Sequence, residues 1–225
     1  MARREAVGAG ARRKPRTAAA PDKPKAYHHG NLRRALLDGA LRLLETKGVA
    51  GLTLRAAARA AGVSQAAPYR HFADKGALLA AVAEEGFRAL TAATRAAMRA
   101  QSGDRVTGFR AHGLAYIRYA VEHPARFRLM FGRESSLHAG PASLRQAANE
   151  TFALLVAGIA GGQKLGVIRA GDPTELALAS WSMVHGLSAL LVDGQLPVGE
   201  ESLDAFASRV LRYLYIGLHG QPPAP

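Results

Sequence analysis

The chain has 225 residues, of which 48% are hydrophobic and none is cysteine. This length and composition can fill a real core, and the absence of cysteine excludes a disulfide framework and a thiolate zinc site. No uninterrupted apolar run approaches the ~18 residues of a membrane span, and the N-terminus lacks the apolar segment of a signal peptide, so a cytoplasmic protein without membrane attachment is expected.

The formal net charge of +13 is concentrated in the first third of the chain. Residues 1–25 carry eight Lys/Arg against two Asp/Glu, residues 26–75 carry eight against three, and residues 76–225 carry fourteen against twelve. A concentrated positive field attracts polyanions, and phosphate neutralisation supplies most non-specific affinity for nucleic acid. A basic tail can equally serve solubility alone, so charge by itself leaves both interpretations open.

The N-terminal segment and the first helix are distinguished by their apolar pattern. Residues 1–25 mix Arg and Lys with Ala, Gly and Pro and show no apolar period, which predicts a disordered basic arm. From Asn31 onward, leucine and alanine recur at helical spacing, and this stripe predicts an amphipathic helix that ends before Gly48.

Three further helix starts follow in close succession. Thr53 is placed to cap a short second helix, which Gly62 ends. Ser64 is placed to cap a third helix that runs to about Phe72. Asp74 opens a long fourth helix, so the sequence predicts three short helices that lead into a long one.

The rest of the chain keeps a helical period and shows no convincing strand alternation. The strongest start signal is Asp172-Pro173-Thr174-Glu175, with a side-chain acceptor, a proline and a carboxylate in the positions that a helix start favours. The predicted helices here are 106–123, 124–131, 143–165, 173–192 and 202–218. An all-α fold of about nine helices is therefore expected.

The predicted organisation has three parts. Residues 1–25 form the arm, residues 26–75 a small unit of three short helices, and residues 76–220 a larger helical part. No internal repeat is visible.

The segment from Thr53 to Lys75 predicts two short helices joined by a tight turn around Gly62. Glycine suits this turn because the chain must adopt a left-handed conformation to reverse within three residues. Ala58 is small where the two helices cross, and Val63 fills the angle between them. This geometry projects the second helix outward, where its first residues can reach base edges in a major groove about 12 Å wide.

The sequence at this point resembles the TetR family of bacterial repressors. The residues that carry the resemblance are Gly62-Val63-Ser64, Tyr69, His71-Phe72, Asp74-Lys75 and Leu78-Leu79. The resemblance implies a transcription regulator of the repressor type, which a small-molecule effector releases from a palindromic operator in double-stranded DNA. It also implies a homodimer whose last two long helices pair with their copies in a four-helix bundle.

Two residues are candidates for reading bases. Gln65 can pair bidentately with adenine, and Ala66 can pack on a thymine methyl group. Pro68 departs from the branched aliphatic residue that is common at this position in the family, and it removes one early helix hydrogen bond, so the pitch of the reading face is left open.

Other residues of the motif are expected to hold the DNA backbone. Thr53 and Arg55 can contact a phosphate at a helix N-terminus, whereas Tyr69, His71 and Lys75 are expected to fix the register. An alternative is that Tyr69 and His71 only cap the core of the small domain, a role that suits Phe72 better. The predicted DNA-binding residues are Thr53, Arg55, Ser64, Gln65, Ala66, Tyr69, His71 and Lys75.

The larger part contains Trp181-Ser182-Met183-Val184-His185-Gly186, which is similar to the TetR subgroup whose C-terminal domain is named for a Trp-His-Gly motif. By itself, a tryptophan near a histidine indicates core more often than a ligand site. The concentration of aromatic residues and methionines favours an effector pocket with His112 and His185 as polar anchors. The predicted ligand-binding residues are Phe87, Phe109, His112, Tyr116, Phe127, Met130, Phe152, Trp181 and His185.

Small residues on the last two long helices would let two subunits approach closely, although internal packing explains them equally well. These residues are Ala179, Gly186, Ala189 and Ala205.

Two other functional classes are alternatives to a transcription regulator. An enzyme is not expected, because the sequence has no nucleophile elbow, phosphate loop or His-Glu-x-x-His motif. No metal or cofactor is expected either. The basic arm leaves a sequence-neutral DNA-binding protein, which compacts DNA without an operator, as the alternative.

Overall fold

The computed structural model describes residues 29–101, 105–135 and 140–219, and the fold within these ranges is all-α. The described residues form eight α-helices and two short 3₁₀ helices, without a strand. The expected basic arm, residues 1–25, lies outside the described residues.

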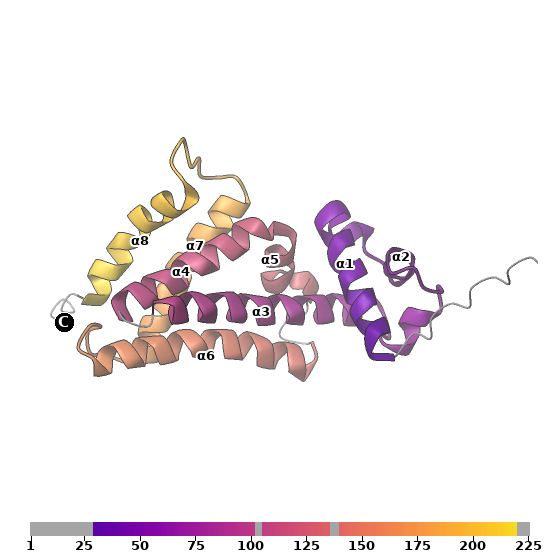
Figure 1. Cartoon of the computed structure of the whole chain (residues 1–225), viewed down its shortest axis with the longest axis horizontal. Coiled ribbons are helices and arrows are strands. Elements are labelled where there is room, and N and C mark those ends of the chain that lie inside the picture. Colours follow the sequence, from indigo (N-terminus) through magenta and orange to yellow (C-terminus); the bar gives the residue numbers. More distant parts are fainter. Residues whose placement is uncertain (1–28, 102–104, 136–139, 220–225) are drawn as a thin grey trace, which may run out of the picture.

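Three elements gather at one end of the molecule (Figure 1). They are α1 (His29–Gly51), α2 (Leu54–Ala60) and the 3₁₀ helix η1 (Ala67–Arg70). Helices α1 and α2 pack closely, because a Cβ atom on Gly39 would lie only 3.1 Å from the backbone oxygen of Ala57. Leu36, Leu52 and Phe72 fill the core of this small unit.

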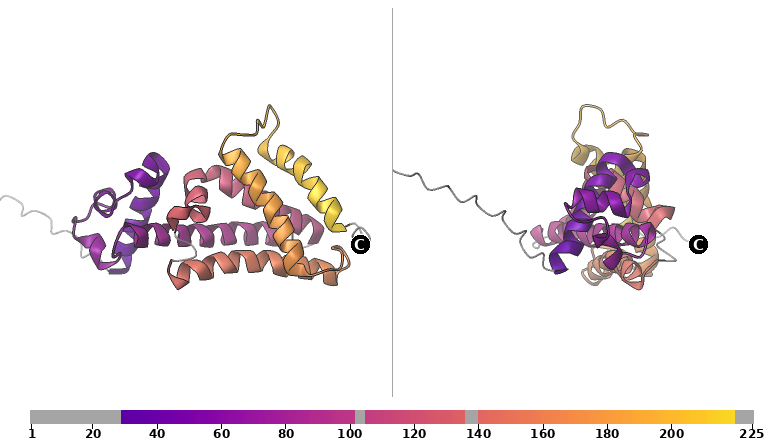
Figure 2. Two further views of the ribbon diagram at one scale, coloured as in Figure 1. Left: turned by 180° about the vertical axis from the view of Figure 1, so that it is seen from behind. Right: turned by 90° about the vertical axis from the view of Figure 1, so that its right-hand side faces the viewer.

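The long helix α3 joins this unit to the rest of the chain. Helix α3 packs against α1 at one end and against α4, α5 and α6 along its length. Figure 1 shows α6 running alongside it. In the view from behind, α7 and α8 lie in front of the other helices (Figure 2). The helices of this larger part are α3 (Lys75–Ala100), α4 (Arg105–Glu122), α5 (Pro124–Phe131), α6 (Ala142–Lys164), α7 (Pro173–Val192) and α8 (Leu203–His219), with a second 3₁₀ helix, η2 (Arg133–Ser135), after α5.

The local signals for helix starts have clear structural counterparts. The side chains of Thr53, Asp74 and Asp172 accept hydrogen bonds from the N–H groups of the first turns of α2, α3 and α7. Helix α5 begins at Pro124, as expected. Gly48 has non-helical dihedral angles, φ 64° and ψ −173°, so the first regular helix ends where the sequence places its end.

The third expected helix is the main departure from the sequence prediction. Ser64 does not cap an α-helix: residues 67–70 form a 3₁₀ helix, and its capping residue, Ala66, makes no side-chain hydrogen bond. The cause is Pro68, which has no N–H to offer the backbone oxygen of Ser64. That oxygen instead accepts from the N–H of Ala67 at 3.0 Å, which is the tighter 3₁₀ pattern. The count of eight α-helices instead of nine among the described residues follows from this difference.

Helix α7 is apolar enough and long enough, by composition and length, to cross a membrane. One such helix is weak evidence for a span, because a core helix of a folded protein passes the same test. Here α7 packs against α4, α6 and α8. Its outward side remains apolar, with Leu178, Met183 and Leu190 exposed.

Candidate functional site: a helix-turn-helix surface and an aromatic cavity

The turn after α2 has the geometry that the sequence predicts. Gly62 has a φ of 68°, in the left-handed region that glycine reaches without a steric penalty. The N–H of Val63 donates to the backbone oxygen of Ala58, and the N–H of Gly62 donates to that of Arg59. These two bonds form a Schellman motif, which ends α2 and turns the chain toward η1.

The residues after this turn are exposed together. Ser64, Gln65 and Ala66 are all open to solvent, and Tyr69 is 54% exposed although it is a large aromatic residue. Pro68, in contrast, is buried and anchors the short helix from beneath. The structure therefore leaves Gln65, Ala66 and Tyr69 accessible to solvent rather than in the interior.

Thr53 and Arg55, at the N-terminus of α2, are exposed as well. The Thr53 hydroxyl oxygen accepts from the N–H of Ala56 at 3.1 Å, which leaves the hydroxyl proton available for another acceptor. Arg55 is exposed in the first turn of the helix. A hydroxyl, free backbone N–H groups and a guanidinium at a helix N-terminus suit a phosphate.

Two predicted backbone clamps are less free than the sequence suggests. The Lys75 ammonium donates to the backbone oxygen of Val49 at 2.7 Å, so this half-buried side chain links the start of α3 to the end of α1. The Nε2 atom of His71 is buried and has no hydrogen-bond partner among the described residues. Phe72 is 3% exposed and fills the small core, as expected.

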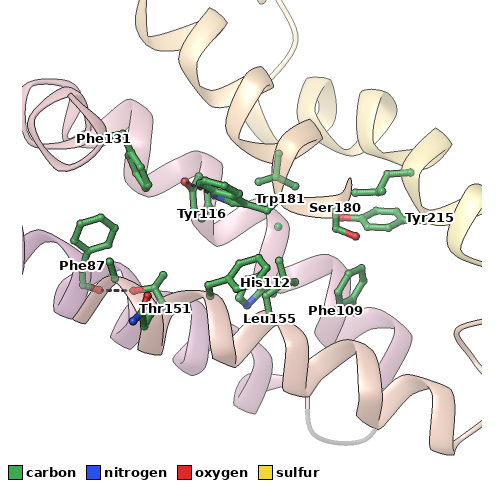
Figure 3. Close-up of a pocket in the computed structure, with 16 residues that line it drawn as sticks. Phe87, Phe109, His112, Tyr116, Phe131, Thr151, Leu155, Ser180, Trp181 and Tyr215 are labelled. Atoms are coloured by element: carbon green, nitrogen blue, oxygen red, sulfur yellow. Dashed lines mark hydrogen bonds between the residues drawn. The ribbon is translucent and has the colours of Figure 1, made fainter. Parts of the chain in front are cut away.

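The larger part holds a partly open cavity of about 230 Å³ among α3, α4, α5, α6, α7 and α8. Figure 3 shows side chains from several helices converging on it. Most of its wall is apolar, and the polar groups are few. We call this space cavity 1. The predicted ligand-binding residues that line it are Phe87, Phe109, His112, Tyr116, Phe152 and Trp181.

The other three predicted ligand-binding residues do not line cavity 1. Phe127 and Met130 are packed into the core of the molecule. His185 lies behind the wall: its Nδ1 atom is 2.9 Å from the Tyr116 hydroxyl, which also accepts a hydrogen bond from the Trp181 indole N–H at 3.3 Å. His185 therefore positions two residues of the wall.

Burial controls the protonation of the polar wall residues. It lowers the pKa of His112 to about 4, so the imidazole is neutral at pH 7. The Nδ1 atom of His112 is buried without a hydrogen-bond partner among the described residues. Burial also raises the pKa of Tyr116 well above its usual value, an effect that the hydrogen bond from Trp181 partly opposes. Cavity 1 is thus lined by neutral groups at pH 7.

Several wall residues are absent from the sequence prediction. Phe131, Thr151, Ser180 and Tyr215 all line cavity 1. The aromatic residues belong to a type that the prediction favoured, but nothing local indicates which rings point inward. The Thr151 hydroxyl lies 2.7 Å from that of Thr91, a contact across 60 residues that no sequence pattern signals.

Helix α5 touches both the cavity and the helix-turn-helix unit. Phe131, at its end, lines cavity 1 and packs on His185 with ring centroids 4.5 Å apart. Arg126, near its start, forms an ion pair with Glu45 of α1 at 3.0 Å. The fold thus has a second connection between its two parts in addition to α3.

Among the described residues, no group of three or more His, Asp or Glu side chains is placed to hold a metal ion. The organisation of the described chain is instead that of a DNA-binding helix-turn-helix unit joined to a helical part with an apolar cavity.

Comparison with known families agrees with this geometry. Residues 36–82 match the model of the tetR family of bacterial regulatory proteins, and residues 109–214 match that of the tetracyclin repressor-like C-terminal domain. Together these matches cover both parts of the molecule. The chain belongs to the TetR family, and it is a DNA-binding transcription regulator of the TetR type.

Solved structures share the fold of this chain. A protein of unknown function from Rhodococcus sp. RHA1 is 36% identical, with a TM-score of 0.77, and the match covers 88% of this chain and 100% of that chain. The TetR family regulator PfmR from Thermus thermophilus is 23% identical, with a TM-score of 0.59 and coverage of 83% and 98%. A putative TetR-family regulator from a Rhodococcus species is also 23% identical, with a TM-score of 0.61 and coverage of 83% and 98%. At this level of identity the last two structures show a shared fold. A comparison with curated proteins found no match to the sequence.

Proposed function

We propose that this protein is a cytoplasmic repressor that binds a palindromic operator as a homodimer and leaves it when a small molecule occupies cavity 1. The observation that carries the proposal is the pairing, in one chain, of an exposed surface after the Gly62 turn with a cavity lined largely by aromatic residues. We assign residues 26–75 to DNA binding and residues 76–220 to ligand binding and dimerisation.

In this proposal, Gln65 and Ala66 read bases while Thr53, Arg55 and Tyr69 hold phosphates. The exposure of all five side chains supports these roles. Phosphate contacts fix register, and contacts to base edges supply sequence preference.

Lys75 and His71 contribute differently from the other predicted contacts. The Lys75 ammonium already donates to a backbone oxygen, so its main role is to hold α3 against α1, with its charge adding to the positive field. The Nε2 atom of His71 is buried, so a contact between His71 and the DNA backbone would use the rest of its half-buried ring.

We propose that α7 and α8 form the dimer surface. Their outward faces are apolar, with Leu178, Met183, Leu190, Tyr213 and Ile216 exposed. An exposed apolar patch of this kind favours contact with another protein surface. A Cβ atom on Gly186 would meet nothing within 4 Å, so a partner helix can approach closely at that point. A twofold dimer would place two reading surfaces one DNA turn apart, about 34–36 Å.

We further assign the C-terminal part to the Trp-His-Gly subgroup of the family. Trp181 and His185 lie one helical turn apart with ring centroids 5.3 Å apart. Both act on Tyr116, one as a donor and one through its ring nitrogen. Gly186 follows on the outward side of α7. The motif thus serves the cavity wall and the dimer surface from a single turn of helix.

Release from the operator would follow from a ligand that favours a different dimer spacing. A ligand shifts such an equilibrium only by its difference in affinity for the two states. In this chain α3 and α5 both connect the cavity to the helix-turn-helix unit. Ligand in cavity 1 would displace Phe131 and change how α5 meets α1.

The proposal is tested by sequencing the genomic fragments that the purified protein retains and confirming the retained site by gel shift. A near-palindromic site that is lost in the Tyr69→Ala variant is the expected result. Equal affinity for any duplex, with the same salt dependence, would instead identify a sequence-neutral DNA-binding protein.

The dimer surface is tested separately by sedimentation. Leu190→Glu combined with Ile216→Glu should yield monomers, because two carboxylates would be buried in an apolar contact. The matched control is Leu165→Glu, which changes another exposed leucine (56% exposed) that follows α6. A dimer that survives the double substitution would place the subunit contact elsewhere.

A further inference from the structure

A second cavity of about 290 Å³ lies beside cavity 1, toward the ends of α3 and α8. We call it cavity 2. Most of its wall is apolar and includes Met98, Leu154 and Ile168. Its wall also carries three arginines, Arg95, Arg99 and Arg110, whereas none of the described residues that line it is acidic.

The three guanidinium groups are available for a ligand. None of them takes part in an ion pair with another described residue. Arg95 and Arg99 are exposed and lie one turn apart on α3, so they share one face of the helix. The Arg110 guanidinium lies over the Tyr215 ring, 5.2 Å from its centroid. Arginine binds carboxylates and phosphates through paired N–H donors.

Two rings separate the cavities. Phe109 and Tyr215 line both spaces, and their rings meet edge to face with centroids 6.1 Å apart. Figure 3 shows both rings at one side of cavity 1. Each cavity by itself is smaller than the roughly 300–1,000 Å³ of common small-molecule sites, whereas the two together fall within that range. A rotation of the Phe109 ring would connect them.

The two cavities differ in charge in a way that defines a ligand. Cavity 1 has no Lys or Arg in its wall, and burial keeps His112 neutral. A charged group there would lose its hydration without a countercharge, which is costly. Cavity 2 supplies the countercharge a short distance away. A single ligand that fits both spaces therefore has an apolar body and an anionic end.

We propose that cavities 1 and 2 form one continuous effector site and that the effector is an amphipathic anion. Its apolar body lies in cavity 1, and its carboxylate or phosphate lies among Arg95, Arg99 and Arg110. This inference rests on the proposed function, because it specifies the chemical class of the effector. It adds that arginines of α3, the helix that leads to the DNA-binding unit, hold the charged end.

The chain carries a reporter for this test. Trp181 is its only tryptophan and lines cavity 1. Decanoate, decanol and decylamine share one apolar chain and differ in the charge of the end group. Titration of the full-length protein with each compound, followed by Trp181 emission and by calorimetry, should show decanoate binding about tenfold more tightly than decanol. Decylamine should bind most weakly. Decyl phosphate then distinguishes a phosphate end from a carboxylate, and tighter binding of either anion than decanol supports the proposal.

Two variants locate the anionic end. Arg95→Gln with Arg99→Gln should lower decanoate affinity about tenfold and leave decanol affinity within about twofold. Gly158→Leu fills cavity 2 without removing charge, since a Cβ atom there meets only Met98, at 3.5 Å, and it should also weaken decanoate. The control is Lys164→Gln, which removes an exposed positive charge two residues beyond Gly162 of the wall without changing the cavity, and it should leave both affinities unchanged.

The outcomes separate this inference from the proposed function. If decanoate and decanol quench Trp181 with equal affinity, cavity 1 remains an effector site and the proposal of an anionic ligand is wrong. If decanoate binds by calorimetry without changing Trp181 emission, the two cavities are not one site, and the proposal is equally wrong. No binding of any of the three compounds also overturns it. Operator binding in a gel shift tests the proposed function independently of all three results.

Discussion

The DNA-binding surface and the cavity use their side chains in opposite ways. Gln65, Ala66 and Tyr69 are exposed, so their removal takes little packing from the fold. Phe87, Tyr116 and His112 line cavity 1 and are buried, so each is both a site residue and a core residue. A substitution at the DNA-binding surface should therefore change DNA binding without changing the stability of the fold. A substitution at the cavity should change both ligand binding and stability.

The largest expected effect tests this contrast by comparing the stability of a cavity variant with that of a surface variant. Phe87→Ala should lower the free energy of unfolding by about 3–5 kcal/mol, because Phe87 is only 2% exposed and the substitution enlarges cavity 1. Tyr69→Ala should change the free energy of unfolding by no more than about 0.5 kcal/mol and still remove operator binding. Urea unfolding and gel shifts measure the two quantities. Equal losses of stability in the two variants would contradict the contrast.

A pH series tests the cavity through His112. Its pKa is about 4 in the folded state and near its ordinary value of 6.5 in the unfolded chain. The unfolded state therefore takes up a proton first, so stability is complete above pH 6.5 and falls as the pH drops toward 4. The expected loss between pH 7 and pH 5 is about 2 kcal/mol.

The pH dependence is measured by urea unfolding at each pH. Burial also lowers the pKa of His185, so both histidines act in the same direction. The His112→Gln variant should lose most of the dependence, and His185→Gln a smaller share. An unchanged slope in His112→Gln would show that its imidazole is not the group responsible.

At the DNA-binding surface, Gln65→Ala should relax sequence preference without removing binding. The lost discrimination should be about tenfold at one base pair of each half-site, since a bidentate contact contributes about 1–3 kcal/mol. Binding to a set of operators with single substitutions gives the value. Arg145→Gln, an exposed change on α6, is the control. A uniform loss across all operators would assign Gln65 to the DNA backbone instead.

The smallest effect concerns communication between the two regions. Glu45→Gln breaks the ion pair with Arg126, whose side chain is 15% exposed while that of Glu45 is 42% exposed. A partly solvated pair contributes about 1 kcal/mol or less, so operator affinity without ligand should hardly change. The ligand concentration needed for release should shift by up to about fivefold. If the variant and the unaltered protein leave the operator at the same ligand concentration, the ion pair does not link the two regions. Helix α3 would then be the only connection between the cavity and the DNA-binding unit.

Local chemistry explains why so much of the fold could be predicted. The caps at Thr53, Asp74 and Asp172 act within four residues, and the helices begin where these signals place them. The 3₁₀ helix after Gly62 is also a local effect, because Pro68 removes one donor. The sequence shows this proline, but not which pattern the neighbouring N–H groups adopt to compensate.

The site was predicted less completely because its geometry depends on distant contacts. Besides the DNA contact expected for it, the Lys75 ammonium donates to Val49, 26 residues earlier in the chain, and no sequence pattern signals this bond. Phe127 and Phe131 are equally aromatic and lie one helical turn apart on α5, yet only Phe131 lines cavity 1. Residue type identified the aromatic cluster. The choice of ring depended on how α5 packs against α3 and α7.

The hydrogen bond from Lys75 to Val49 has a mechanical consequence. It ties the end of α1 to the first residue of α3, so a tilt of α3 would be passed to the small helical unit. Helix α3 has 26 residues and is therefore about 39 Å long. It can act as a lever: a tilt of about 5° at its cavity end would carry the reading surface by about 3 Å, which is close to the spacing of successive base pairs.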